Sequence, residues 1–234
     1  MRDGSDKDCE SMRMALEKFS LEVLVRKDFT KSQIKEELEN LAKMDHSKND
    51  CFVLVILTHG SPNQLYAKDD KFDVSLLWEN FVGSKCESLI GKPKLFFIQA
   101  CRGTKFDNGA PQPSLPPNAT TGADASSFTI PSTGDILVMY ATFEGYYAFR
   151  NQENGSNFIQ TLSKTLLENG SKVELKKLLK YVQRQIALKF ISNNPNEPES
   201  HQKKQMPCIV STLTKDFYFT KKDIVELDTA KASV

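Results

Sequence analysis

The chain has 234 residues, of which 39% are hydrophobic and 26% charged, and this length and composition suit one large α/β domain. Its 31 basic and 30 acidic side chains leave a net charge of +1, which argues against nucleic acid or an acidic membrane as a partner. The strongly apolar runs 52–57 and 95–98 are far shorter than the roughly 20 residues of a membrane span. Five cysteines without regular spacing favour neither a disulfide framework nor a zinc site. We therefore expect a reduced, cytoplasmic protein without a metal or another cofactor.

The predicted elements alternate between helices and strands. In chain order, apolar spacing predicts a helix around 12–19, a helix around 34–41 after the capping pair Thr30 and Gln33, strands at Cys51–Leu57, Lys94–Cys101 and Asp135–Ala141, helices at Ser156–Leu167 and Val173–Phe190, and a strand at Cys208–Leu213. The first two strands are continuously apolar, which is typical of strands covered on both faces. The sequence therefore predicts an α/β fold with a mostly parallel central sheet and helices on both faces.

Residues 104–131 interrupt this alternation and contain five of the ten prolines. A stretch of this length without an apolar pattern is unusual inside a compact domain, and it predicts a linker. The linker divides a large N-terminal region, 1–103, from a smaller C-terminal region, 132–220. Residues 221–234 form a tail with weak periodicity.

His59 and Cys101 stand out because each directly follows one of the two best strands. Ligands of open parallel sheets bind outside the carboxyl ends of the strands, so these two side chains are expected to face one crevice. A thiolate is a nucleophile, and a nearby imidazole can take the thiol proton and later protonate a leaving amine. Chance matches to such short strings are common, so spacing alone leaves this interpretation even with a structural one. The remaining histidines, His46 and His201, are expected at the surface, and we expect structural roles for the other cysteines, Cys9, Cys51, Cys86 and Cys208.

The string Gln99-Ala100-Cys101-Arg102-Gly103 matches the caspase nucleophile motif, and His59 lies 42 residues before Cys101, near the family's usual separation. Further segments resemble executioner caspases in family order and extend the resemblance over about residues 2–219: Asp45-His46-Ser47, Gly91–Ile98, Gly145–Asn151, Gly155–Gln160 and Lys203–Cys208. Within the family, Ile130–Thr133 and the strand after it resemble an insect executioner caspase of the Decay type. The resemblance implies the caspase–hemoglobinase fold.

The resemblance also implies roles for individual residues. Cys101 would be the nucleophile and His59 the catalytic imidazole, with the backbone N–H groups of Gly60 and Cys101 as the oxyanion hole. The family cleaves after aspartate, and Arg2, Gln99 and Arg150 occupy the positions that hold this side chain. Tyr147 and Phe149 would form the pocket for the residue before the aspartate, and Asn151 would meet the fourth residue from the bond. Asn157 stands where executioners usually have Trp, which leaves the preference of the outer pocket open.

By resemblance, the chain is a zymogen that is cut in its linker, and the flanking small residues favour cleavage after Asp124. The strand Cys208–Leu213 would lie at a two-fold interface between large/small pairs. Other implied partners are protein substrates with exposed Asp sites, an initiator caspase and inhibitor-of-apoptosis proteins. The family has a strand before the pocket arginine, so we expect a truncated start of the large region. A different function stays open, namely a catalytically impaired homologue that dimerises with and regulates an active caspase.

Overall fold

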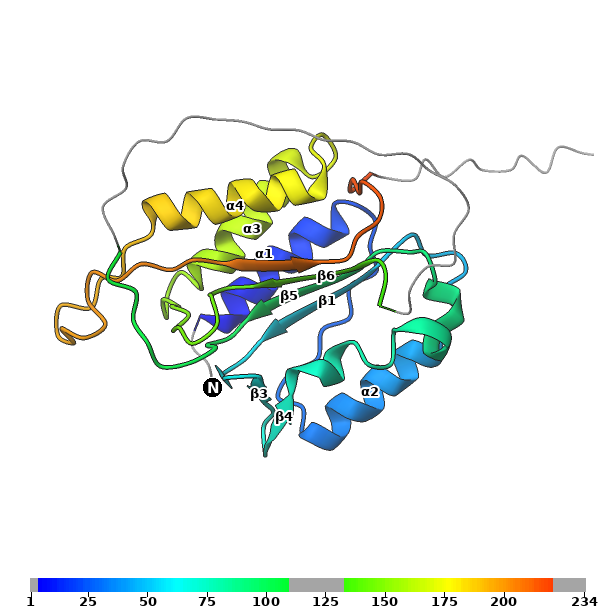
Figure 1. Cartoon of the computed structure of the whole chain (residues 1–234), viewed down its shortest axis with the longest axis horizontal. Coiled ribbons are helices and arrows are strands. Elements are labelled where there is room, and N and C mark those ends of the chain that lie inside the picture. Colours follow the sequence, from blue (N-terminus) through cyan, green and yellow to red (C-terminus); the bar gives the residue numbers. More distant parts are fainter. Residues whose placement is uncertain (1–3, 110–132, 221–234) are drawn as a thin grey trace, which may run out of the picture.

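The computed structural model describes residues 4–109 and 133–220. The expectations for Arg2, for Asp124 and most of the linker, and for the tail lie outside these residues. A four-stranded sheet runs through the centre of the molecule, and its strands lie in the order β1 (Phe52–Leu57), β5 (Lys94–Gln99), β6 (Ile136–Tyr140) and β7 (Cys208–Ser211) (Figure 1). β1, β5 and β6 are parallel, and β7 is antiparallel to β6. The mostly parallel sheet predicted from the sequence is confirmed.

The alternation of side chains along β5 divides the core into two layers. Leu95 and Phe97 point to one face of the sheet, whereas Phe96 and Ile98 point to the other. Every residue of β5 and β6 is buried, because helices or loops cover both faces. β1 and β7 form the two edges of this sheet and are only partly buried.

Three helices cover one face of the sheet: α1 (Ser5–Glu17), α3 (Asn157–Asn169) and α4 (Leu175–Lys189) (Figure 1). Their apolar stripes meet Phe97 and Met139 in the larger core cluster, and Phe158 and Leu162 of α3 are fully buried there. α3 begins at Ser156, whose hydroxyl accepts a hydrogen bond from the N–H of Ile159 and caps the helix. These packed helices fix the position of the segment 141–156, which connects β6 to α3.

The other face is covered by α2 (Lys31–Lys43), by the 3₁₀ segments η1 (Val74–Leu77) and η2 (Gly83–Leu89), and by a second, three-stranded sheet. α2 begins with the predicted capping pair, since the Thr30 side chain and the Gln33 side chain each bind the other's backbone N–H. The second sheet comprises β2 (Gly60–Ser61), β3 (Gln64–Tyr66) and β4 (Lys71–Asp73), all antiparallel. The sequence did not predict this sheet, because its strands are only two or three residues long.

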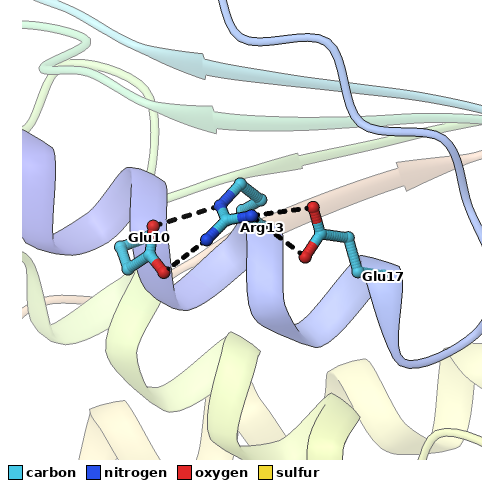
Figure 2. Close-up of polar contacts among 3 residues, drawn as sticks. All are labelled: Glu10, Arg13 and Glu17. Atoms are coloured by element: carbon cyan, nitrogen blue, oxygen red, sulfur yellow. Dashed lines mark hydrogen bonds and ion pairs between the residues drawn. The ribbon is translucent and has the colours of Figure 1, made fainter.

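The exposed face of α1 carries an arginine between two glutamates. Arg13 is in ion-pair contact with Glu10 at 2.7 Å and with Glu17 at 3.0 Å (Figure 2). The spacing of three and four residues places the three side chains on one helix face, away from the buried Met12, Ala15 and Leu16. Such solvated pairs add little stability, so the apolar contacts with α3 hold α1 in place.

His46 corrects one expectation, because it is buried and not a surface residue. Its Nε2 is hydrogen-bonded to the carbonyl oxygen of Leu41 at 2.8 Å, and its Nδ1 to the Asn49 amide at 2.9 Å. The imidazole thus completes the hydrogen bonding at the carboxyl end of α2. Polar neighbours in the sequence suggested solvent exposure, whereas the fold supplies these polar partners inside the protein.

Candidate active site

His59 and Cys101 occupy equivalent positions on neighbouring parallel strands. Leu57 and Gln99 are register partners at the ends of β1 and β5, and the pairing continues with a hydrogen bond of 3.0 Å from Thr58 N to Gln99 O. His59 and Cys101 each follow by two residues, so both stand at the carboxyl edge of the main sheet. This is the edge at which the sequence placed them, although their catalytic roles remain predictions.

Cys101 lies between two backbone segments. On one side, Ala148 N donates a hydrogen bond of 3.4 Å to the half-buried Cys101 Sγ, which also lies 3.7 Å from Ala148 O. On the other side, Cys101 O packs against Gly60, where a Cβ would lie only 2.3 Å from that oxygen. No side chain larger than hydrogen fits there, and the backbone after His59 therefore approaches Cys101 closely.

The exposed His59 is bordered by the second sheet. Its carbonyl oxygen accepts a hydrogen bond of 3.1 Å from Tyr66 N, and the centroid of its ring lies 6.4 Å from that of Tyr66. Next to this sheet, a shallow hollow lies beside Cys101 and is lined by residues that include Asn63, Gln64, Arg102 and Tyr140. Arg102 stacks on the Tyr140 ring at 4.0 Å and pairs with Glu144 at 3.5 Å.

Two of the three predicted aspartate-binding residues lie close together. Gln99 is buried, with its Nε2 3.5 Å from Phe149 O, which directly precedes Arg150. Gln99 Oε1 has no hydrogen-bond partner among the residues that the structure describes. Arg150 Nη1 donates a bond of 2.8 Å to the hydroxyl of Ser5, at the start of α1. The backbone of Gly4 also packs tightly against Asn151 O, so the chain that follows Arg2 runs along the Arg150 segment.

The buried carboxylate of Asp8 fixes the loop that carries Arg150 and Asn151. Asp8 accepts hydrogen bonds from Ser156 N at 2.9 Å and from Gln160 Nε2 at 2.8 Å. Burial raises the pKa of Asp8 above its usual value, although these hydrogen bonds and the charge of Arg150 act in the opposite direction. Asn151 itself is exposed, and its Oδ1 accepts bonds from the backbone N–H groups of Glu153 and Asn154.

An aromatic cluster lies beside these polar groups. The Phe149 ring is 6.0 Å from Phe106, 6.0 Å from Tyr147 and 5.4 Å from Phe190, and Tyr147 is 42% exposed. The sequence left open whether Tyr147 and Phe149 form a pocket or pack in the core. Both belong to this cluster, whose outer part reaches solvent at Tyr147.

Gln205, a residue that sequence reasoning did not assign to the site, holds the loop of Phe149 in place through hydrogen bonds. Its buried amide accepts a bond of 2.8 Å from Phe149 N and donates one of 2.8 Å to Ala141 O. The side chain therefore joins the loop of Phe149 to the end of β6. The only sequence signal for Gln205 was its place in the segment Lys203–Cys208, which resembles the family. Asp8 was likewise not assigned to the site, and its only signal was that the stretch after Arg2 resembles the family.

Within residues 4–109 and 133–220, no cluster of three or more His, Cys, Asp or Glu side chains could hold a metal ion. No helix in these two ranges has the length and apolarity required to cross a membrane. The five cysteines are free thiols, and burial raises the pKa of Cys51 to about 11. A high pKa keeps Cys51 protonated, which agrees with the structural role expected for it.

The comparisons with known proteins identify the fold and the family. A family model described as the caspase domain matches residues 1–218. The crystal structure of Caspase-1 from Spodoptera frugiperda superposes with a TM-score of 0.87 at 37% identity, covering 95% of this chain and 84% of that one. The fold is therefore the caspase–hemoglobinase fold that the sequence predicted. The chain belongs to the caspase family of cysteine proteases.

Insect caspases are among its relatives. Caspase drICE of Drosophila melanogaster is 39% identical over 223 residues, which are 95% of this chain and 66% of that protein. Caspase-1 of Spodoptera frugiperda is 38% identical over 221 residues, or 94% of this chain and 73% of the relative. Caspase-7 of Gallus gallus is 39% identical over 219 residues, 93% of this chain and 71% of the relative. The chain thus spans about two thirds to three quarters of the length of these relatives.

Proposed function

We propose that this protein is an aspartate-specific cysteine endopeptidase of apoptosis, made as one chain and activated by cleavage of its linker. The observation that carries the proposal is the shared register of β1 and β5. Because Leu57 pairs with Gln99, the imidazole of His59 and the thiol of Cys101 start from neighbouring points of one sheet edge. A nucleophile and a base in this arrangement are what acyl transfer requires.

In the proposed reaction, His59 takes the proton of the Cys101 thiol, and the thiolate attacks the carbonyl carbon of the substrate. The backbone N–H groups of Gly60 and Cys101 donate to the oxygen that becomes negative. His59 then gives its proton to the leaving amine as the peptide bond breaks. Water hydrolyses the resulting thioester with the same imidazole as base, which returns the free thiol and releases the carboxylic acid.

Specificity for aspartate follows from Arg2, Gln99 and Arg150. Planar guanidinium groups bind a carboxylate through two parallel hydrogen bonds, and the Gln99 amide can add a third donor. A substrate with Asn in place of Asp would leave these cations without a partner, so discrimination should be strong. Tyr147 and Phe149 would form the apolar wall for the residue before the aspartate, and Asn151 would meet the fourth residue from the bond.

The decisive experiment measures cleavage of a fluorogenic tetrapeptide ending in Asp, beside the same peptide ending in Asn. We expect turnover of the Asp peptide alone, no turnover by Cys101→Ala, and loss of most turnover by Arg150→Lys, because an ammonium cannot replace the guanidinium fork. Undiminished activity of Cys101→Ala would refute the mechanism. A folded, inactive wild-type protein that raises the activity of another caspase would instead support the regulatory homologue.

Activation is proposed to occur between Asp124 and Ala125, which leaves pieces of 124 and 110 residues (234 − 124 = 110). Cutting releases the linker ends and lets the substrate-binding loops form, an order–disorder switch known from many enzymes. Mass spectrometry of the active protein should find a new amino terminus at Ala125, and Asp124→Ala should keep the chain intact and poorly active. Normal processing of Asp124→Ala would contradict this assignment.

The active form is proposed to be a homodimer of large/small pairs that meet at β7. This antiparallel strand is an edge of the main sheet, and its Val210 is 55% exposed. Pairing two such edges about a two-fold axis would remove the unpaired backbone of both. Sedimentation at micromolar concentration should show a dimer after linker cleavage, and a monomer alone would contradict the proposal. An initiator caspase and inhibitor-of-apoptosis proteins are the further proposed partners, with the cytoplasm as the proposed location.

A further inference from the structure

The three-stranded sheet beside His59 presents a lysine that the proposed mechanism does not use. Tyr66 of β3 is hydrogen-bonded to the backbone of His59, and Lys71 of β4 is the register partner of Tyr66. Neighbouring strands are about 4.8 Å apart, so the Lys71 backbone lies about 10 Å from that of His59. Three residues of an extended peptide, at about 3.3 Å each, cover the same distance.

Lys71 is held above the ring of Tyr66. Its ammonium lies 4.9 Å from the ring centroid, within the range of a cation–π contact. Lys71 and then Ser61 lower the pKa of the Tyr66 phenol by hydrogen bonding to it. The ammonium is therefore placed by contacts with a residue that itself touches His59.

The charge of Lys71 is not neutralised by a paired carboxylate. Among the described residues, no acidic oxygen lies within the 4.0 Å of an ion pair with its ammonium. The nearby acids have other ion-pair or hydrogen-bond partners: Asp69 accepts a bond from Lys31 N at 2.8 Å, Asp70 pairs with the Lys31 ammonium at 2.8 Å, and Asp73 accepts a bond from Ser75 N at 2.8 Å. Asp70 also accepts a bond from the Lys71 backbone N–H and feels the charge of Lys71 without forming an ion pair with it. The side chain of Lys71 is exposed and available to a ligand.

The direction of a bound substrate follows from the chemistry of the site. The imidazole that protonates the leaving amine must stand on the side of the residues that follow the cleaved bond. Arg150 and Gln99, by contrast, lie with the Ala148 segment, which contacts the other flank of Cys101. A peptide that continues past His59 therefore reaches Tyr66 first and Lys71 next.

We propose that Tyr66 and Lys71 form a subsite for an acidic side chain, Asp or Glu, located two or three residues after the cleaved bond. This inference rests on the proposed endopeptidase function and adds a substrate preference to it. An ion pair at an exposed site contributes about 0.2–1 kcal/mol, which corresponds to a preference of up to about fivefold.

The test uses internally quenched peptides that are identical up to the aspartate and carry Glu, Gln or Lys at the second or third position after it. The wild-type enzyme should show a two- to fivefold higher kcat/KM for the Glu peptide than for the Gln peptide, with the Lys peptide poorest. In Lys71→Met the ratio of Glu to Gln should fall to about one, and in Lys71→Glu the order should invert. High salt should reduce the wild-type ratio, since the pair is solvated.

The matched control is Lys68→Met, an exposed lysine of the β3–β4 connection for which the described residues show no cation–π contact with Tyr66. It should keep the wild-type ratio of Glu to Gln. Equal ratios in the wild-type enzyme and Lys71→Met, or a ratio of one in the wild-type enzyme, would overturn the subsite while leaving aspartate cleavage intact. Absence of any cleavage after aspartate would overturn the proposed function and this inference together.

Discussion

Gly60 and Cys101 touch through their backbones, because a Cβ at Gly60 would lie 2.3 Å from the carbonyl oxygen of Cys101. This contact sets the separation between the loop that carries His59 and the loop that carries Cys101.

Gly60→Ala should therefore abolish most activity. The methyl group would overlap backbone that belongs to the nucleophile loop and not a flexible side chain, so the two loops must separate. Displacement of a catalytic group by about 1 Å can cost about a hundredfold in rate. Steady-state kinetics together with thermal unfolding would check this, and wild-type kcat/KM in the variant would contradict it.

Ser5→Ala should weaken substrate binding more than it slows the chemical steps. The Ser5 hydroxyl accepts the bond from Arg150 Nη1, and its loss frees the guanidinium to leave the proposed aspartate pocket. A hydrogen bond of about 1 kcal/mol corresponds to a fivefold rise of KM. Ser5→Thr, which keeps a hydroxyl, should restore the wild-type KM. An unchanged KM in Ser5→Ala would show that other contacts place Arg150.

Gln205→Leu should destabilise the protein and impair the substrate loop. The leucine lacks the amide that binds both groups, so Phe149 N and Ala141 O lose their hydrogen bonds to this side chain in a largely buried place. Each unsatisfied group costs about 1–3 kcal/mol. Urea unfolding would measure the loss of stability. The control is Gln152→Leu, the same substitution at an exposed glutamine. Equal stability of the two variants would rule out this role of Gln205.

The raised pKa of Asp8 gives stability a definite dependence on pH. Between the unfolded pKa of about 4 and the higher folded value, the folded state holds more protons on Asp8 than the unfolded chain. The contribution of this group to stability is therefore present at low pH and is lost as pH rises through the folded pKa. Asp8→Asn removes the titration, so the stability of the wild type relative to this variant should fall from pH 4 to pH 7.

Urea unfolding at several pH values would measure this difference. Asp45→Asn serves as the control, because hydrogen bonds from Ser47 lower the pKa of Asp45 and move its stability change below pH 4. Its difference from the wild type should stay flat over the same range. A flat difference for Asp8→Asn as well would show that Asp8 does not couple folding to pH.

The sequence alone determined the local features of this protein. Continuous apolar runs predicted β1 and β5, and β5 is indeed buried at every position because both of its faces are covered. The pair Thr30 and Gln33 predicted the start of α2, because the capping bonds form within one helical turn. The string around Cys101 indicated the caspase family, to which the chain belongs.

The tertiary structure decided what depends on contacts between distant segments. Asp8 and Ser156, or Gln205 and Phe149, are far apart in the chain, and no local pattern predicts that one will bind the other. For the same reason His46 was expected at the surface, although Leu41 and Asn49 bind it inside the protein. The short strands of β2–β3–β4 have little propensity of their own and form where His59 and Tyr66 meet. A buried polar group is stable only with its partner in place, and the fold alone brings the partners together.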